Sequence, residues 1–266
     1  IMDRVIPFVR GAAEAGRPFL AVIWFHAPHL PVVAGPRHLA LYADVADTGH
    51  RHYYGCLSAL DEQVGRLRAE LRSLGIAEDT LLWYTSDNGP ETWPGGPSPG
   101  LTGPFRGRKR SLLEGGVRVP AILEWPGRIA AGRESSLPCS TSDLLPTVLE
   151  LVDERKIEQI DGLVGPLDGE SLAPLLTGSM ERRESALAFA SRRQLALHRD
   201  RWKIYSADGG ERFALYDLDV DPGEARDLVD EHPAVLAGLR AELDAWRTSC
   251  AASERGADYP AEAPSK

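Results

Sequence analysis

The run Leu81-Leu82-Trp83-Tyr84-Thr85 leads directly into Ser86-Asp87-Asn88-Gly89, and this stretch decides how the fold is interpreted. The apolar run has the length and bulk of a buried strand. Asp87 and Asn88 then supply two adjacent oxygen ligands, and Gly89 permits the sharp turn that lets both side chains reach one point. Ligands sit at the carboxyl ends of strands in open α/β sheets, and hard cations prefer such oxygens, so the stretch predicts a metal site. For this tetrapeptide taken alone, the alternative is an Asx turn that only caps the strand.

Strand and helix patterns alternate on both sides of this stretch. The apolar run over residues 19–25 is typical of a second strand, and it ends in His26-Ala27-Pro28-His29. Leucines and one valine at alternating spacings of three and four predict a helix over 57–74, which Gly75 ends. Further elements are expected as helices over 1–15 and 143–151 and as a strand over 121–124. The alternation predicts an α/β fold with a mostly parallel wound sheet.

After about residue 180 the alternation of strand and helix patterns gives way to a series of short strand patterns. Short strands are expected over 186–190, 194–198, 202–205 and 213–216, with Asp208-Gly209-Gly210 as a hairpin turn. A helix over 233–248 follows, residues 153–169 are expected to be irregular, and the polar tail after Ala251 is expected to be disordered. We therefore expect two parts, a catalytic α/β part over 1–180 and a small antiparallel sheet with a helix over 181–266.

Composition limits the classes of partner. The chain has 266 residues, a net charge of −9 and a pI near 5.3, which argues against nucleic acid or an anionic membrane as the main partner. No apolar run approaches the roughly 18–20 residues that span a bilayer. The three cysteines form no disulfide framework. The compartment stays open between periplasmic or secreted and cytoplasmic.

Several short motifs stand in one order along the chain. They are His26-Ala27-Pro28-His29-Leu30-Pro31, Ser86-Asp87-Asn88-Gly89, Gly103-Pro104-Phe105-Arg106-Gly107-Arg108-Lys109, Glu114-Gly115-Gly116-Val117-Arg118-Val119-Pro120, Ser140-Thr141-Ser142-Asp143, Asp168-Gly169-Glu170 and Leu215-Tyr216-Asp217. In type and order they resemble the type I, formylglycine-dependent sulfatases of the alkaline-phosphatase superfamily. The resemblance covers residues 19–228, and it implies the alkaline-phosphatase-like form of the α/β fold.

The resemblance implies a role for each candidate site residue. Asp87 and Asn88 match the metal ligands, with Ca²⁺ expected and Mg²⁺ as the alternative. His29 matches the histidine that assists the leaving group, and a histidine can supply that proton near neutral pH. Lys109 matches the lysine that contacts sulfate oxygens, although the basic neighbours Arg106, Arg108 and Arg110 leave the register ambiguous. His26 either contributes to substrate binding beside His29 or is structural.

Other polar residues are interpreted as structural or stay open. Glu114 and Arg118 are expected to form a buried ion pair or a loop brace. The acidic residues of Asp217-Leu218-Asp219-Val220-Asp221 resemble a calcium loop, but a turn of the small sheet is the stronger interpretation. Trp93 lies in a long loop, where it either stacks on a sugar or aryl group or packs as an ordinary loop tryptophan.

The family's nucleophile motif, Cys/Ser-x-Pro-x-Arg, does not occur in this chain. None of Cys56, Cys139 and Cys250 begins such a motif. We therefore expect the C-terminal portion of a sulfatase for a sulfated small molecule or carbohydrate, inactive alone, with formylglycine supplied by a missing N-terminal segment. Pairing with that half, or an oligomer, is expected. The alternatives are a phosphoester or phosphonate hydrolase of the same superfamily, and a non-catalytic fragment or binding partner.

Overall fold

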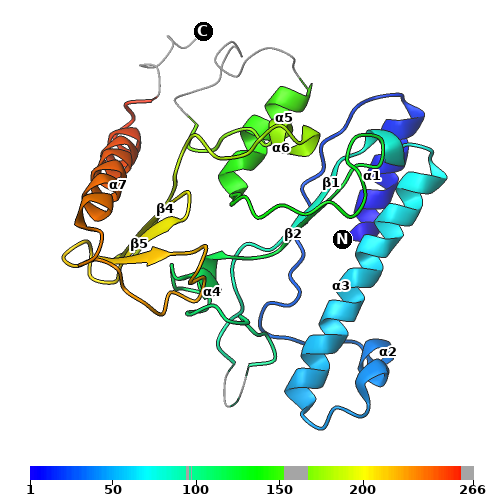
Figure 1. Cartoon of the computed structure of the whole chain (residues 1–266). Coiled ribbons are helices and arrows are strands. Elements are labelled where there is room, and N and C mark those ends of the chain that lie inside the picture. The colour runs from blue at the N-terminus through cyan, green and yellow to red at the C-terminus, as the bar shows by residue number, and fades with distance from the viewer. Residues whose placement is uncertain (94–95, 97, 153–166, 259–266) are drawn as a thin grey trace. The chain divides into compact units, whose positions relative to one another are not determined.

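The computed structural model describes residues 1–93, 96, 98–152 and 167–258 (Figure 1). The chain forms two compact units. The first unit comprises residues 1–85, 91–101 and 121–132, and the second comprises 86–90, 102–120 and 133–266. Each unit has its own apolar core. The predicted boundary near residue 180 stays a prediction.

Two helices build the core of the first unit. Helix α1 (Met2–Glu14) and helix α3 (Thr48–Ser73) pack through buried Val9, Leu67 and Leu71. At the start of α3, the Asp47 carboxylate accepts a hydrogen bond of 2.7 Å from the His50 backbone N–H, which caps the helix. After α3 the chain turns at Gly75 with a φ of 69°. Both predicted helices are confirmed, and α3 begins earlier than the leucine pattern indicated. Two short helical turns lie between α1 and α3, namely α2 (Pro36–Leu39) and η1 (Ala40–Tyr42). A third, η2 (Ala77–Asp79), follows α3.

The strands of the first unit are β1 (Leu82–Thr85) and β2 (Ala121–Glu124), as the sequence predicted. They pair antiparallel, with Tyr84 opposite Ile122. Among the described residues no parallel strand pair occurs, so the mostly parallel sheet is not seen in this chain.

The expectation of a strand over 19–25 was wrong for the described structure, in which these residues pair with no other strand. Their burial nevertheless alternates with a period of two. Phe19, Ile23 and Phe25 pack against the α1–α3 core, whereas Leu20, Val22 and Trp24 are exposed. A strand needs a neighbour that completes its hydrogen-bond ladder, and the described chain provides none at this segment.

The second unit contains a four-stranded antiparallel sheet in the order β3-β4-β5-β6. The strands are β3 (Leu187–Ser191), β4 (Gln194–Arg199), β5 (Trp202–Ser206) and β6 (Ala214–Asp217). Helix α7 (Pro233–Glu254) covers one face through Leu239 and Leu243, which pack with Leu197 and Ile204 (Figure 1). The predicted small sheet and its helix are confirmed. The helix continues past Ala251, where a disordered tail was expected, so that prediction was wrong up to Glu254.

The remaining helices of the second unit are short. They are α4 (Glu114–Val117), η3 (Thr141–Asp143), α5 (Leu144–Val152) and α6 (Ala173–Thr177). Helix α5 confirms the helix expected over 143–151. Most of the segment expected to be irregular, residues 153–166, lies outside the described residues. None of the helices in the described part of the chain has the length and apolar character needed to cross a bilayer.

Candidate functional site

The two candidate histidines lie together in a turn of the first unit. The backbone N–H of His29 donates to the His26 carbonyl at 2.8 Å, and the two ring centroids are 5.1 Å apart. The Nδ1 atom of His29 lies 2.6 Å from the carbonyl oxygen of Leu30. A carbonyl can only accept, so Nδ1 carries a proton and Nε2 is the nitrogen that can exchange a proton with a ligand.

The candidate metal ligands follow β1 directly, in a segment that belongs to the second unit. Asp87 is exposed and Asn88 is half-buried. The Asn88 side-chain nitrogen donates to the Gly89 carbonyl at 2.8 Å, so the amide oxygen is the atom available to a cation. The Ser86 hydroxyl donates to the Asn88 carbonyl at 3.1 Å, which tightens the turn.

Glycines hold this segment against the loop that follows it. Gly89 is buried, and a Cβ placed on it would lie 1.9 Å from the carbonyl oxygen of Gly115. Its N–H donates to the Gly116 carbonyl at 2.9 Å. A Cβ on Gly115 would in turn lie 2.5 Å from the Arg106 carbonyl oxygen. Backbone meets backbone at distances that no other residue type permits, which explains the pair of glycines after Glu114.

The same packing brings Lys109 to the metal-ligand segment. The Lys109 backbone N–H donates to the Pro90 carbonyl at 3.1 Å. Within the described part of the chain, the Lys109 ammonium has no hydrogen-bond or ion-pair partner, so it can bind an anion. Arg106, by contrast, donates to the carbonyl of Glu224. This difference favours Lys109 over Arg106 as the anion-binding residue of the basic loop, which comprises residues 103–113.

Glu114 takes part in a buried ionic cluster. The ammonium of Lys203 lies 2.7 Å from Glu114 Oε1 and 2.9 Å from Glu224 Oε1. Glu224 Oε2 also accepts a hydrogen bond of 2.7 Å from the Glu114 backbone N–H. Burial raises the pKa of the Glu224 carboxyl above its usual range, and the Lys203 charge opposes that rise. Arg118 lies 3.6 Å from Glu114 and is largely exposed, so the predicted brace exists but Lys203 is its principal cation.

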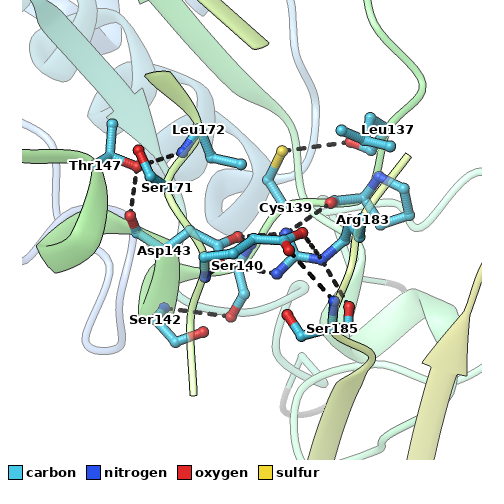
Figure 2. A network of polar contacts seen from close by, with 12 residues as sticks. Leu137, Cys139, Ser140, Ser142, Asp143, Thr147, Ser171, Leu172, Arg183 and Ser185 are labelled. Carbon is cyan, nitrogen blue, oxygen red and sulfur yellow. Dashed lines mark hydrogen bonds and ion pairs between the residues drawn. The ribbon is translucent and has the colours of Figure 1, made fainter. Parts of the chain in front are cut away.

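A second buried polar network joins two motifs that the sequence left without a role. The Asp143 carboxylate accepts two bonds from the Arg183 guanidinium, at 2.7 and 2.9 Å, and Figure 2 shows the two groups facing each other. The same carboxylate accepts from the Glu170 backbone N–H at 2.9 Å. The Thr147 hydroxyl donates to the Asp143 carbonyl and accepts from the Leu172 N–H. This network is structural, because every group in it is bonded within the protein.

Cys139 lies at the edge of this network. Its thiol donates to the Leu137 carbonyl, with 3.4 Å between sulfur and oxygen. The residue is exposed by surface area, yet surrounding protein atoms raise the pKa of the thiol to about 11, and the Asp143 charge adds to the rise. A thiol in this state is a poor nucleophile at neutral pH.

The two open interpretations of other residues are now constrained. Trp93 is half-buried, its ring is 6.3 Å from the ring of Tyr53, and it closely approaches Gly49. It therefore packs within the first unit. The Asp217 carboxylate binds Arg201, with 2.8 Å from Nε to Oδ1, and accepts from the Asp219 N–H. The turn interpretation of residues 217–221 is confirmed.

The residues present fit only part of a calcium site. Carboxylate and amide oxygens suit the ion, but calcium usually takes 6–8 oxygens. Among the described residues no group of three or more His, Cys, Asp or Glu side chains is placed to hold a metal. Asp87 and Asn88 can therefore contribute to a site that other oxygens complete.

Comparison with known proteins identifies the family. The sulfatase family model matches residues 1–154, and a model described as the C-terminal part of N-sulphoglucosamine sulphohydrolase matches residues 105–249. The chain belongs to the sulfatase family, whose fold is of the alkaline-phosphatase type.

One curated relative supports the same assignment, and two solved structures are similar in fold. The chain is 32% identical to the steryl-sulfatase of Mus musculus over 93% of this chain and 44% of the relative. A solved sulfatase from Pseudoalteromonas sp. superposes with a TM-score of 0.74 at 24% identity, covering 97% of this chain and 53% of that one. A solved phosphonate monoester hydrolase of Agrobacterium radiobacter superposes with a TM-score of 0.53 at 26% identity, covering 76% and 41%. The chain thus spans about half the length of the curated relatives that it matches.

Proposed function

We propose that this chain is the part of a sulfatase that binds the metal and the sulfate group, in an enzyme that hydrolyses a sulfate monoester to an alcohol and sulfate. The observation that carries the proposal is the glycine-packed contact between the Asp87-Asn88-Gly89-Pro90 segment and the loop of Lys109. It brings a pair of oxygen ligands near an ammonium group that has no partner among the described residues, and a bound metal ion together with this ammonium would bind the negatively charged sulfate ester group.

Each residue has a chemical role in this proposal. Asp87 and Asn88 would hold a calcium or magnesium ion, which when bound supplies positive charge to a sulfate oxygen. The Lys109 ammonium binds a second sulfate oxygen and stabilises the charge that develops there. His29 gives a proton from Nε2 to the departing alcohol oxygen, while Nδ1 stays bonded to Leu30. His26 lies against His29 and restricts the orientation of its ring.

The attacking group lies outside this chain in the proposal. The sequence contains no Cys/Ser-x-Pro-x-Arg motif, so formylglycine would come from a polypeptide that completes the domain. The segment 19–25 supports such a complement. Leu20 and Val22 are each 67% exposed and Trp24 is 85% exposed, on the face opposite the packed residues of the same segment. An apolar element packed over this face would cover them, and an added strand paired with the edge of the segment would extend the fold toward the expected mostly parallel sheet.

The runner-up function is phosphoester or phosphonate hydrolysis. The structural neighbour from Agrobacterium radiobacter, named a phosphonate monoester hydrolase, supports it. Metal, lysine and histidine can serve a phosphoryl group as well as a sulfuryl group, so these residues do not discriminate. The nucleophile would discriminate, because formylglycine in a Cys/Ser-x-Pro-x-Arg motif favours sulfate esters, whereas unmodified Ser or Thr favours phosphoryl transfer.

The experiment uses a protein in which this chain is part of a whole sulfatase domain. We expect Lys109→Ala to lower kcat/KM for nitrophenyl sulfate by about 100-fold, as the loss of a charge-stabilising group does. Arg110→Ala is the matched control on the same loop, and it should change kcat/KM by less than about 3-fold. Equal losses in the two variants, or higher activity on nitrophenyl phosphonates than on sulfates, would contradict the proposal.

A further inference from the structure

The small sheet of the second unit has two unlike faces. On β5, Ile204 faces α7 and belongs to the apolar core. Its neighbour Lys203 points to the opposite face, because successive side chains of a strand alternate. Lys203 is 1% exposed and lies opposite Tyr216 of β6, which packs with Leu113 of the basic loop. The face away from α7 therefore covers the loop that carries Lys109.

Two polar side chains on that face bind this loop. Lys203 binds Glu114 at 2.7 Å, and the buried Glu224 at 2.9 Å completes the ionic cluster. Gln194 of β4 uses both ends of its amide. Its nitrogen donates to the Arg110 carbonyl at 2.7 Å, and its oxygen accepts from the Leu112 N–H at 3.1 Å. Gln194 therefore binds the loop at residues 110 and 112, and Lys203 binds it at residue 114.

These contacts reach the candidate site through short backbone paths. Gln194 contacts Arg110, the residue after Lys109. The backbone of Arg110 has a φ of 76°, a conformation that few residues other than glycine adopt. The Lys203 contact fixes Glu114, which is followed by the two glycines that pack on Arg106 and Gly89. Displacement of either contact would shift Lys109 relative to Asp87 and Asn88.

We propose that Lys203 and Gln194 are positioning residues, through which the small C-terminal sheet sets the place of Lys109 beside the metal-ligand segment. In this proposal neither side chain binds the anion, and both act through the loop that carries Lys109. The inference rests on the proposed function, because it assigns these residues to the sulfate site. The contact of Lys203 and Gln194 with the loop of Lys109 can also be tested separately from sulfate binding.

The first measurement is hydrogen exchange of the chain, followed at single amides by NMR. The Lys109 amide donates to Pro90 and the Gly89 amide donates to Gly116, so both report the loop contact. Gln194→Ala removes a half-buried amide and leaves the cluster of Lys203 intact. We expect it to speed exchange at both amides by at least about 5-fold, because it removes the hydrogen bonds to Arg110 and Leu112. Arg193→Ala, at the neighbouring exposed position, is the control and should change neither amide.

Lys203→Met is the stronger variant, and it needs a check on folding. It leaves two buried carboxylates without their cation, which can unfold the unit. The companion variant Lys203→Met/Glu114→Gln/Glu224→Gln removes all three charges at nearly constant volume. Exchange at the buried amides of Leu197 and Ile204 serves as the internal reference. Faster exchange at Gly89 and Lys109 with unchanged exchange at the reference amides supports the proposal.

The second measurement reports the anion. The chain has four lysines, so the side-chain CH₂ signal of Lys109 can be assigned by substitution and titrated with inorganic sulfate. We expect half-saturation to need at least about 5-fold more sulfate in Gln194→Ala and in the triple variant than in the parent, matching the lost contacts.

The outcomes separate the two proposals. Unchanged exchange at Gly89 and Lys109, or a rise that the reference amides share in full, would overturn the positioning role. Changed exchange together with sulfate half-saturation equal to that of the parent would also overturn it. If the Lys109 signal of the parent chain does not change when sulfate is added, the proposed function is contradicted. The exchange data would then still decide whether the small sheet positions the loop of Lys109.

Discussion

The backbone N–H of Lys109 donates a hydrogen bond of 3.1 Å to the carbonyl oxygen of Pro90. Pro90 stands two residues after Asn88, so this bond ties the candidate anion-binding lysine to the candidate metal ligands through main-chain atoms alone. Side-chain substitution cannot remove it directly. Its stability depends on how closely the glycines beside it can pack, and this dependence can be tested.

Gly89→Ala should destabilise the second unit. The added methyl would lie 1.9 Å from the Gly115 carbonyl oxygen, and backbone must move to accept it. We expect a loss of about 1–3 kcal/mol in the free energy of unfolding, the usual cost of overpacking, measured by urea denaturation. Gly238→Ala in α7 is the control, since its Cβ would meet open space, and it should gain about 0.5–1 kcal/mol. A neutral Gly89→Ala would show that the close contact does not exist in solution.

Arg183→Met should be among the most destabilising single substitutions in the second unit. It leaves the fully buried Asp143 carboxylate without its bidentate partner, at an expected cost of about 3–5 kcal/mol. Arg193→Met removes an exposed ion pair with Glu211 and should cost no more than about 1 kcal/mol. Similar unfolding free energies for the two variants would contradict the assignment of the Asp143 network as a structural anchor.

Cys139 should react slowly with alkylating reagents. With a thiol pKa of about 11, only a small fraction is thiolate at pH 8.5, so iodoacetamide should modify Cys139 in the folded protein at least about 10-fold more slowly than in the unfolded chain.

The raised pKa of Cys139 also predicts that the folded protein loses stability at alkaline pH. The neutral Cys139 thiol contributes fully to the free energy of unfolding below pH 9.0, the pKa of the thiol in the unfolded chain. This contribution is lost as the pH rises toward 11, the pKa in the folded protein. Cys139→Ser should abolish this loss of stability at alkaline pH. Equal dependence of the unfolding free energy on pH in the parent chain and in Cys139→Ser would contradict the raised pKa.

His29→Ala in a whole sulfatase domain should affect poor leaving groups most. An alkyl sulfate needs a proton on its departing oxygen, whereas a nitrophenolate departs readily without one. We expect kcat to fall by at least about 10-fold more for an alkyl sulfate than for nitrophenyl sulfate, with the bound metal content unchanged. Asp87→Ala should instead lower metal content and regain part of its activity in excess Ca²⁺. Equal losses on both esters would exclude His29 as the proton donor.

The sequence predicted most elements because their patterns are local. The leucine spacing of α3, the hairpin signal at Asp208-Gly209-Gly210 and the short strands of the small sheet each depend on neighbouring residues. The segment 19–25 failed for a non-local reason. Its alternation is that of a strand, but a strand also requires a partner, which the described chain does not provide.

The candidate site was predictable only where a motif carried it. Asp87, Asn88 and Lys109 stood out because of the residues around them. Lys203 and Gln194 gave no such signal, since a lysine or glutamine in a short strand normally faces solvent. Their burial arises from tertiary packing over sequence separations that no local pattern records. The convergence of His29 with Asp87 and Lys109 joins two separately described units, and it stays a prediction.

The most direct test of the central claim is an assay of the purified chain, residues 1–266, on nitrophenyl sulfate with Ca²⁺. The chain holds groups that can bind the anion and stabilise charge, but it contains no formylglycine motif to attack sulfur. We predict turnover no higher than that of the Lys109→Ala variant measured beside it. Turnover that Lys109→Ala abolishes, with no other polypeptide present, would contradict the account and place the nucleophile within this chain.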